Sequence, residues 1–376
     1  MRYTLMNKTR ELLDVEMDRG TILSLHNIRD ENKHLLPVFL TPGENQKISR
    51  SSVADWWSGR RIPASRGGIK ELFWHLNDIS LDFLAEKSLG LSLSDQYWIR
   101  PNKETTWESV NFFQNDFSED IGKLLITGDW NGGSLISPDN TSDGVVRKRW
   151  KIIDKTRYLI KGSSGIPWQA QPFREVFASR TAKILFEAHG LYDKVVEYDF
   201  LWDGDFVYSK CPNFVTVDTE YVAMYQINQA HKKSKYTSAY EFTKGFFGNE
   251  GEVLDLTLIL DYIVLNEDRH FGNFGLIRNA DTGEYQGAAP LFDTGASLFF
   301  DSPRIDVYRI GSKPFSKSFS QQIKYIDTSA YAAAIKAVDG EIETIFWDVF
   351  KDAFEEKGRL EQIMATVKNQ LKNLNA

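Results

Sequence analysis

The stretch LNEDRHFGNFGLIRN at residues 265–279, followed by APLFDTG at residues 289–295, decides how the rest of this 376-residue chain is interpreted. Within it, Asp268 precedes Asn273 by five positions, and Asp293 follows a short apolar run. Phosphoryl transfer from a nucleotide uses one carboxylate to accept the proton of the attacking hydroxyl, and an amide oxygen with a second carboxylate to hold Mg²⁺. The stretch indicates that chemistry, although an isolated Asp and Asn pair is more often a cluster of Asx turns.

The residues around this stretch favour the catalytic interpretation. An apolar helix is expected directly before the loop, and strands on both sides of a turn should place Asn273 beside Asp293, as a shared metal ion requires. Arg269 is expected to pair with a carboxylate or a phosphorylated residue. His270 is expected to orient Asp268 or to pack in the loop, because no second metal ligand lies near it.

A lysine and a glutamate upstream have a spacing that fits the same chemistry. Lys161 ends a predicted strand over residues 157–161, and Glu175 lies early in a predicted amphipathic helix over residues 171–189 that stops at Gly190. Protein kinases fix their phosphate-binding lysine with a glutamate of the next helix. We therefore predict that Lys161 contacts the nucleotide phosphates and pairs with Glu175, the alternative being a lysine at a solvent-facing strand end.

A polar loop at residues 137–144 precedes these strands. Its backbone N–H groups and the hydroxyls of Ser137, Thr141 and Ser142 are candidates for covering the nucleotide phosphates. The loop contains a single glycine, so it is neither a Walker loop nor a GxGxxG motif. An ordinary polar hairpin is the alternative interpretation.

Residues 210–213 are expected to join the two halves of the chain. The backbone of Lys210, Cys211 and Pro212 is then a candidate for binding adenine, as the segment between the lobes of a kinase does.

The composition argues against several other classes of protein. The chain is 42% hydrophobic and 26% charged, with a net charge of −7 and a pI near 5.5, which argues against a dedicated nucleic-acid binder. A basic loop at residues 60–68 could meet phosphate or a carboxylate-bearing partner, but a surface loop above packed tryptophans is favoured. The single cysteine, the absence of a signal-like apolar N-terminus and the lack of a spanning apolar run predict a cytoplasmic protein without an integral membrane segment.

The predicted fold class is α+β, a two-lobed protein-kinase-like fold. It has an N-terminal region of uncertain role at residues 1–120, a β-rich nucleotide-binding lobe at 121–212 and a mainly helical lobe at 213–376. Strands are expected as a hairpin within residues 1–40 and at 124–127, 145–153, 157–161, 195–200 and 205–209. Helices are expected at residues 51–57, 69–76, 81–89, 107–121, 171–189, 219–230, 238–247, 252–265, 329–338 and 341–374, with an irregular stretch at 294–325.

Taken together, these residues resemble the HipA-like serine/threonine kinase family, which includes the HipA toxins and CtkA-type bacterial kinases. The resemblance rests on DRHFGNFG at residues 268–275 and LFDTG at 291–295, with support from residues 137–144, 158–162 and 173–175, and it covers about residues 120–375. It departs from the Asp-Phe-Gly of eukaryotic kinases at Thr294.

The resemblance implies a role for each matched residue. Asp268 would be the base, Asn273 and Asp293 the Mg²⁺ ligands, Lys161 the phosphate lysine and Glu175 its partner. It also implies ATP and Mg²⁺ as cofactors, a protein Ser/Thr hydroxyl as acceptor, an antitoxin or regulatory partner, and autophosphorylation in the loop at residues 137–144.

Three other functions share parts of this pattern. A small-molecule phosphotransferase has the same catalytic spacing. A lipid kinase shares the Asp-Arg-His-x-x-Asn string and would need a basic surface, for which residues 304–324 carry some positive charge. A pseudokinase binding module would use the arginines at residues 60–68 to hold DNA or a protein.

Overall fold

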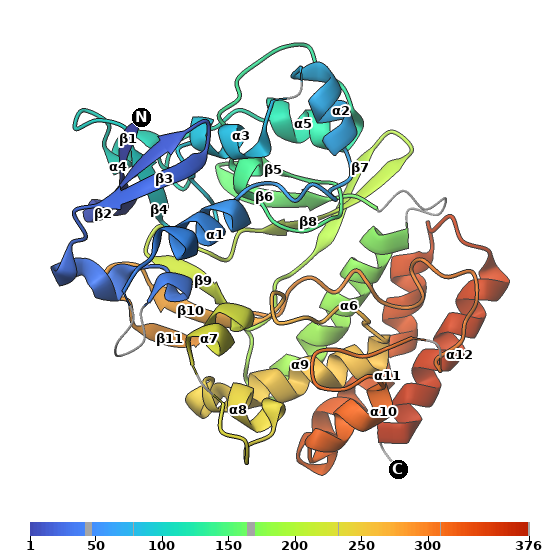
Figure 1. Cartoon of the computed structure of the whole chain (residues 1–376). Helices are drawn as coiled ribbons and strands as arrows, with labels where there is room; N and C mark the ends of the chain where they lie inside the picture. The colour runs from blue at the N-terminus through green and yellow to red at the C-terminus, as the bar shows by residue number, and fades with distance from the viewer. Residues whose placement is uncertain (42–46, 78, 164–169, 232, 309, 375–376) are drawn as a thin grey trace.

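The computed structural model of the chain is described here for residues 1–376, except 42–46, 78, 164–169, 232, 309 and 375–376. Its strands form three antiparallel sheets, and the helices of the C-terminal half gather on one side of the molecule (Figure 1). None of the helices outside those gaps is both long and apolar enough to cross a membrane. Short 3₁₀ helices lie at Asp30–Leu35, Val38–Leu40, Pro138–Thr141, Gly248–Glu250, Ile323–Tyr325 and Thr328–Tyr331.

The N-terminal region contains a four-stranded sheet of order β3-β2-β1-β4. The strands are β1 (Arg2–Asn7), β2 (Arg10–Asp18), β3 (Thr21–His26) and β4 (Tyr97–Arg100). The predicted hairpin is confirmed as β2 and β3, with Arg19 and Gly20 at positive φ in the turn. Helix α1 (Arg50–Arg60) buries Trp56 and Trp57 against the apolar face of this sheet.

Of the four helices that follow, the first two match those predicted at residues 69–76 and 81–89, and the last two differ from the prediction. They are α2 (Ile69–His75), α3 (Leu81–Lys87), α4 (Trp107–Val110) and α5 (Asp120–Thr127). The predicted helix over residues 107–121 is wrong beyond Val110, and the strand expected at 124–127 is helix α5. Ile121, Leu124 and Leu125 are spaced so that they share one helix face, which buries against α2 and α3. The boundary predicted at residue 120 therefore falls within this packing unit.

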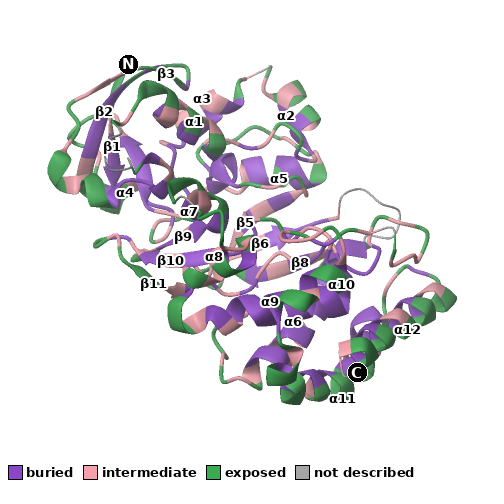
Figure 2. Cartoon of the chain, turned by 60° about the horizontal axis from the view of Figure 1, so that its bottom comes forward, coloured by how far each residue is buried: buried purple, intermediate pink, exposed green. Residues whose placement is uncertain are grey.

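The β-rich lobe has the strand order β5-β6-β8-β7. Its strands are β5 (Lys148–Ile153), β6 (Thr156–Lys161), β7 (Asp199–Asp203) and β8 (Phe206–Pro212). Asp154 and Lys155 both have positive φ, the conformation of the tight two-residue hairpin turn that joins β5 and β6. Helix α6 (Ala170–Glu187) is buried on most sides rather than amphipathic, because it packs against β8, α9 and α11 (Figure 2).

The C-terminal half combines a small sheet with a helical core. The sheet has order β11-β10-β9, from β9 (Thr219–Ala223), β10 (Gly275–Asn279) and β11 (Tyr285–Ala288). The helices are α7 (Met224–Ala230), α8 (Ala239–Gly245), α9 (Gly251–Val264), α10 (Phe319–Gln322), α11 (Ala332–Phe350) and α12 (Lys357–Leu374).

Two helix predictions in this half need correction. Residues 219–223 form a strand, because they pair with β10 along its whole length. The last two helices are separated at residues 351–356 and not near residue 340. The β10–β11 hairpin has the predicted strand–turn–strand order, so it returns the chain from the loop after α9 toward Asp293.

Candidate active site

A cleft of about 620 Å³ lies where the β-rich lobe, the residues after β8 and the loops around β10 and β11 meet. It also has a wall from the N-terminal region, which includes Trp56 and Asp95. The sequence-predicted residues that line it are Thr141, Ser142, Lys161, Glu175, Cys211, Pro212, Asp268, His270, Asn273 and Asp293.

Lys161 lies at the centre of the charged end of this cleft. It is the last residue of β6, and its ammonium group donates to the carboxylate of Glu175 on α6 and to Asp293 Oδ1 at 2.6 Å. Burial alone would lower the pKa of Lys161, but the charges of Asp293 and Glu175 outweigh it and raise that pKa above its usual range. Two carboxylates therefore converge on one buried lysine: the Glu175 contact is the predicted one, and the Asp293 contact is an additional one.

The pKa of Asp293 moves in the opposite direction. Burial would raise it, but the nearby ammonium groups of Lys161 and Lys148 hold it below its usual range. The backbone of Asp293 is in the left-handed region, with a φ of 56°. The carboxylate is thus ionised and available as an oxygen ligand.

Arg269 holds the loop that carries Asp268 and Asn273. Helix α9 ends at Leu265 in the left-handed conformation, and the fully buried Arg269 guanidinium then donates to Asp261 on α9 at 2.9 and 3.1 Å. Its Nη1 also donates to the carbonyl oxygens of Asn273 at 2.8 Å and Phe292 at 2.7 Å. One guanidinium thereby connects the two segments that carry the predicted metal ligands, and its partner is a carboxylate, as expected.

Asp268 and His270 lie at the rim of the cleft. Asp268 Oδ1 accepts a hydrogen bond from Lys313 Nζ at 2.8 Å, and the Asn273 side-chain amide donates to the Asp268 carbonyl at 3.1 Å. The exposed His270 ring accepts from the backbone N–H of Gly272 at 3.0 Å. In the described part of the chain the ring makes no hydrogen bond with the Asp268 carboxylate, so His270 stabilises the loop turn and does not orient the base.

The polar loop at residues 137–144 is more buried than expected. The Ser137 hydroxyl is fully buried, donates to Asp139 at 3.0 Å and does not line the cleft. Thr141 and Ser142 do line it, but their hydroxyls donate to the carbonyl oxygens of Leu91 at 2.6 Å and Asp139 at 3.0 Å. The three hydroxyls are therefore hydrogen-bonded within the chain, and a role of this loop in covering the phosphates stays a prediction.

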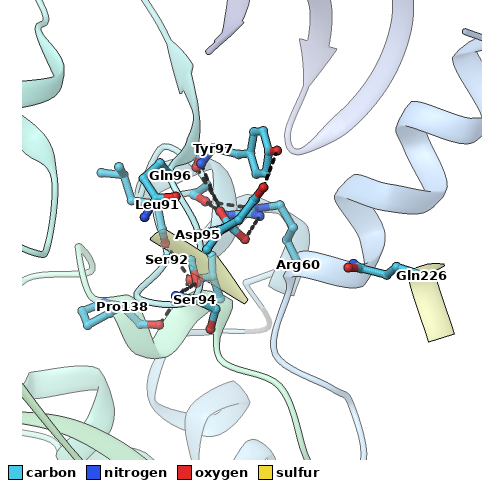
Figure 3. A network of polar contacts seen from close by, with 12 residues as sticks. Arg60, Leu91, Ser92, Ser94, Asp95, Gln96, Tyr97, Pro138 and Gln226 are labelled. Atoms are coloured by element: carbon cyan, nitrogen blue, oxygen red, sulfur yellow. Dashed lines mark hydrogen bonds and ion pairs between the residues drawn. The ribbon is translucent and has the colours of Figure 1, made fainter. Parts of the chain in front are cut away.

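The arginines of residues 60–68 also form hydrogen bonds or ion pairs with other residues of the chain. Arg60 donates to both carboxylate oxygens of Asp95 at 2.8 and 3.0 Å (Figure 3). It also donates to the Gly90 carbonyl at 2.6 Å. Arg61 pairs with Asp82, and the buried Arg66 donates to Ser142 Oγ at 2.6 Å. Arg60 thus lines the N-terminal wall of the cleft, and all three arginines have partners within the chain.

The N-terminal region makes direct hydrogen bonds with the start of the C-terminal half. The Ser94 carbonyl accepts from the backbone N–H of Tyr221 at 2.9 Å, and the Gln96 side chain donates to the Thr216 carbonyl at 2.8 Å. The role of the first 120 residues, left open by the sequence, thus includes bracing the start of the C-terminal half.

The end of β8 and the residue after it border two cavities. Cys211 is buried and lines the cleft together with Pro212 and Asn213. Lys210 points to the other side of the strand, where it lies 3.7 Å from Asp199 and lines a separate cavity of about 470 Å³. The Lys210 side chain therefore lies outside the cleft, and adenine binding by the backbone of residues 210–212 stays a prediction.

Lys148 is a cleft residue that sequence reasoning missed. It lies directly opposite Lys161 in the β5–β6 pair, is only 8% exposed, and has no ion pair or hydrogen bond within the described residues. Burial, together with the positive charges of Arg66 and Lys161, lowers the pKa of Lys148 to about 8. Like charges directly opposite each other destabilise a sheet, so this pair is suited to an anionic ligand. The two-residue turn at Asp154 and Lys155 fixes this register, so the turn is the feature of the sequence from which the pairing of Lys148 with Lys161 can be inferred.

Comparisons with known proteins agree with this architecture. No protein-family model and no curated protein sequence matches the chain. Among solved structures, the HipA–HipB toxin–antitoxin complex of Shewanella oneidensis MR-1 with its operator DNA matches at 11% identity and a TM-score of 0.54, over 99% of this chain and 96% of that chain. The Helicobacter pylori proinflammatory kinase CtkA matches at 17% identity and a TM-score of 0.46, over 62% of this chain and 91% of that chain. The likeness to HipA shows that the chain has a HipA-like fold, of the predicted α+β class.

Proposed function

We propose that this chain is an ATP- and Mg²⁺-dependent kinase that transfers the γ-phosphate to a serine or threonine hydroxyl of a protein. The observation that carries the proposal is the pair of buried lysines, Lys148 and Lys161, which lie opposite each other and line the same cleft as Asp293 and Asp268. Lys148 is nine-tenths buried and makes no ion pair or hydrogen bond among the described residues, although the charge of Asp293 acts on it. A buried ammonium group without a hydrogen-bond partner is costly unless a ligand bonds to it.

The residues present fit a nucleotide with Mg²⁺. Lys161 and Lys148 would contact its phosphates, and Cys211 and Val215 offer an apolar surface for its base. Asn273 and Asp293 supply two oxygen ligands, and no group of three acidic, histidine or cysteine ligands occurs in the parts of the chain that are described. Such a small ligand set suits Mg²⁺, which keeps water and phosphate oxygens as its other ligands, and which when bound would neutralise charge on the transferring phosphoryl group.

Asp268 would act as the base. The proton of the acceptor hydroxyl moves to its carboxylate while the bond from the acceptor oxygen to the γ-phosphorus forms. The bond between that phosphorus and the bridging oxygen breaks, and ADP leaves with the electron pair. Trp56, Tyr225 and Gln226 also line the cleft, so the N-terminal region and α7 would contribute walls to the acceptor site.

The nucleotide site is tested by replacing Lys148 with methionine. Lys148→Met should weaken Mg²⁺–ATP binding by roughly tenfold or more, because a buried charge-assisted contact is worth about 1.5–3 kcal/mol. Isothermal titration calorimetry measures this affinity, and Lys151→Met on the same strand, outside the cleft, is the matched control. Equal affinity in both variants and the wild type would contradict the assignment.

Lys148→Met should also change how the free energy of unfolding depends on pH. The folded pKa of Lys148, about 8, lies below the ordinary value of 10.5, so the unfolded chain binds more protons at this lysine between those values. The contribution of Lys148 therefore makes the free energy of unfolding rise from about pH 8 upward, and Lys148→Met should flatten that rise in urea titrations.

The acceptor class needs its own experiment. After incubation with labelled ATP and Mg²⁺, phosphoamino-acid analysis should find the label on serine or threonine of the chain itself or of added proteins. Label recovered only on small molecules or lipids would favour the alternative phosphotransferases. A regulatory or antitoxin-like partner also stays a prediction, motivated by the HipA structure having been determined with HipB and operator DNA.

A further inference from the structure

A lysine from the long segment after Asp293 contacts the proposed base. Lys313 Nζ lies 2.8 Å from Asp268 Oδ1, and this is the one ion pair of Asp268 within the described residues. Figure 1 shows the segment in orange, running as an irregular trace between β11 and α10. Lys313 does not itself line the cleft, so it approaches the carboxylate from outside the nucleotide site.

The turn that carries Lys313 is held on both sides. Phe315 packs edge-on against Phe271 of the catalytic loop, with ring centroids 5.8 Å apart, and against Tyr240 of α8 at 5.6 Å. The Phe315 backbone N–H also donates to Gln322 Oε1 at 3.1 Å, and the buried Ser312 hydroxyl donates to the Ser316 carbonyl at 3.2 Å. The position of the Lys313 backbone is therefore fixed relative to the loop that carries Asp268.

Lys313 is a cation that lies among acidic side chains near Asp268. Glu267 is the neighbouring residue, and burial together with the charges of Asp301 and Asp268 raises the pKa of Glu267, with Lys313 acting in the opposite direction. Lys148 and Lys161 lie on the β-rich lobe, on strands β5 and β6. Lys313 thus supplies positive charge next to Asp268 and Glu267 from a segment outside the β-rich lobe.

The hydrogen bonding of Asp268 is asymmetric. Oδ1 is taken by Lys313, whereas Oδ2 has no hydrogen-bond partner in the part of the chain that the structure describes. The side chains of Lys313 and Asp268 are 54% and 48% exposed, and such a pair contributes little to folding. A contact that adds little stability, yet is built on an anchored turn, is suited to orienting a functional group.

We propose that Lys313 is a positioning residue: it fixes Oδ1 of Asp268 so that Oδ2 receives the proton of the acceptor hydroxyl. The inference rests on the proposed kinase function. As the acceptor oxygen bonds to the γ-phosphorus and the bond to ADP breaks, the proton ends on Oδ2 while Oδ1 keeps its hydrogen bond to the lysine.

The test compares Lys313→Met, Lys313→Arg and the control Lys317→Met, an exposed lysine of the same segment. Lys313→Met should lower kcat by roughly 10- to 100-fold, the order expected when a catalytic group is misplaced by about 1 Å, with KM for ATP unchanged. Lys313→Arg should recover part of the loss, and Lys317→Met should behave as the wild type. All four proteins should have the same Tm.

Two outcomes would overturn the inference. An unchanged or higher kcat in Lys313→Met would mean that the contact is idle or inhibitory, and a lower Tm with a raised KM for ATP would indicate a structural role. Both outcomes can be measured only if the wild type transfers phosphate. A wild type without any transfer would instead contradict the proposed function and this inference together, so the two failures are distinguishable.

Discussion

Asp268→Asn is expected to lower the rate of phosphoryl transfer by about 10²–10⁴, the usual contribution of a general base. The amide retains the size of the side chain but cannot accept the proton of the acceptor hydroxyl. Because Asp268 lies at the cleft rim, whereas Lys161 and Asp293 lie at its charged end, Mg²⁺–ATP affinity should change little. Single-turnover kinetics with labelled ATP, together with calorimetric titration of ATP, measure both quantities.

Asp301→Asn is the matched control for this experiment. Asp301 is an exposed acid that affects the charge near Glu267 but does not line the cleft. It should retain the transfer rate of the wild type. Equal loss of rate in both variants would mean that net negative charge in this region, and not the base at Asp268, supports the reaction.

Arg269→Met is expected to lower the free energy of unfolding by about 3–5 kcal/mol. The substitution removes the partner of the fully buried Asp261 and leaves the carbonyl oxygens of Asn273 and Phe292 without their shared donor. An unpaired buried carboxylate is the costly element in this change. Urea denaturation followed by circular dichroism measures the effect.

Arg180→Met provides the comparison on an exposed ion pair. Arg180 and Asp348 are 40% and 51% exposed, and a surface pair of this kind is worth about 0–1 kcal/mol. A loss in Arg269→Met no larger than in Arg180→Met would contradict the role of Arg269 as the connection between the two loops.

The central part of the fold could be predicted from sequence because its signals are local. The β5–β6 hairpin follows from two alternating strands around a two-residue turn, and the start of α6 follows closely, so Lys161 and Glu175 are brought together by short-range structure. The catalytic loop likewise follows an apolar helix and precedes a hairpin, which places Asn273 and Asp293 at one cleft.

The wrong predictions concern residues whose partners are distant in the chain. Arg66 reaches Ser142 across 76 positions, and Arg60 reaches Asp95 across 35, so neither the basic loop nor the polar loop is solvated as its composition suggests. Helix α5 and strand β9 were assigned wrongly because their short apolar runs fit either conformation until tertiary packing decides.

The most direct test of the account is transfer of labelled phosphate from ATP to protein in the presence of Mg²⁺, comparing wild type with Asp293→Asn. The wild type should label serine or threonine, in the chain itself or in lysate proteins. The variant should lose that labelling, since Asp293 is both the proposed Mg²⁺ ligand and the partner of Lys161. Equal labelling by the two proteins, or none by either, would contradict the assignment of this cleft as a kinase active site.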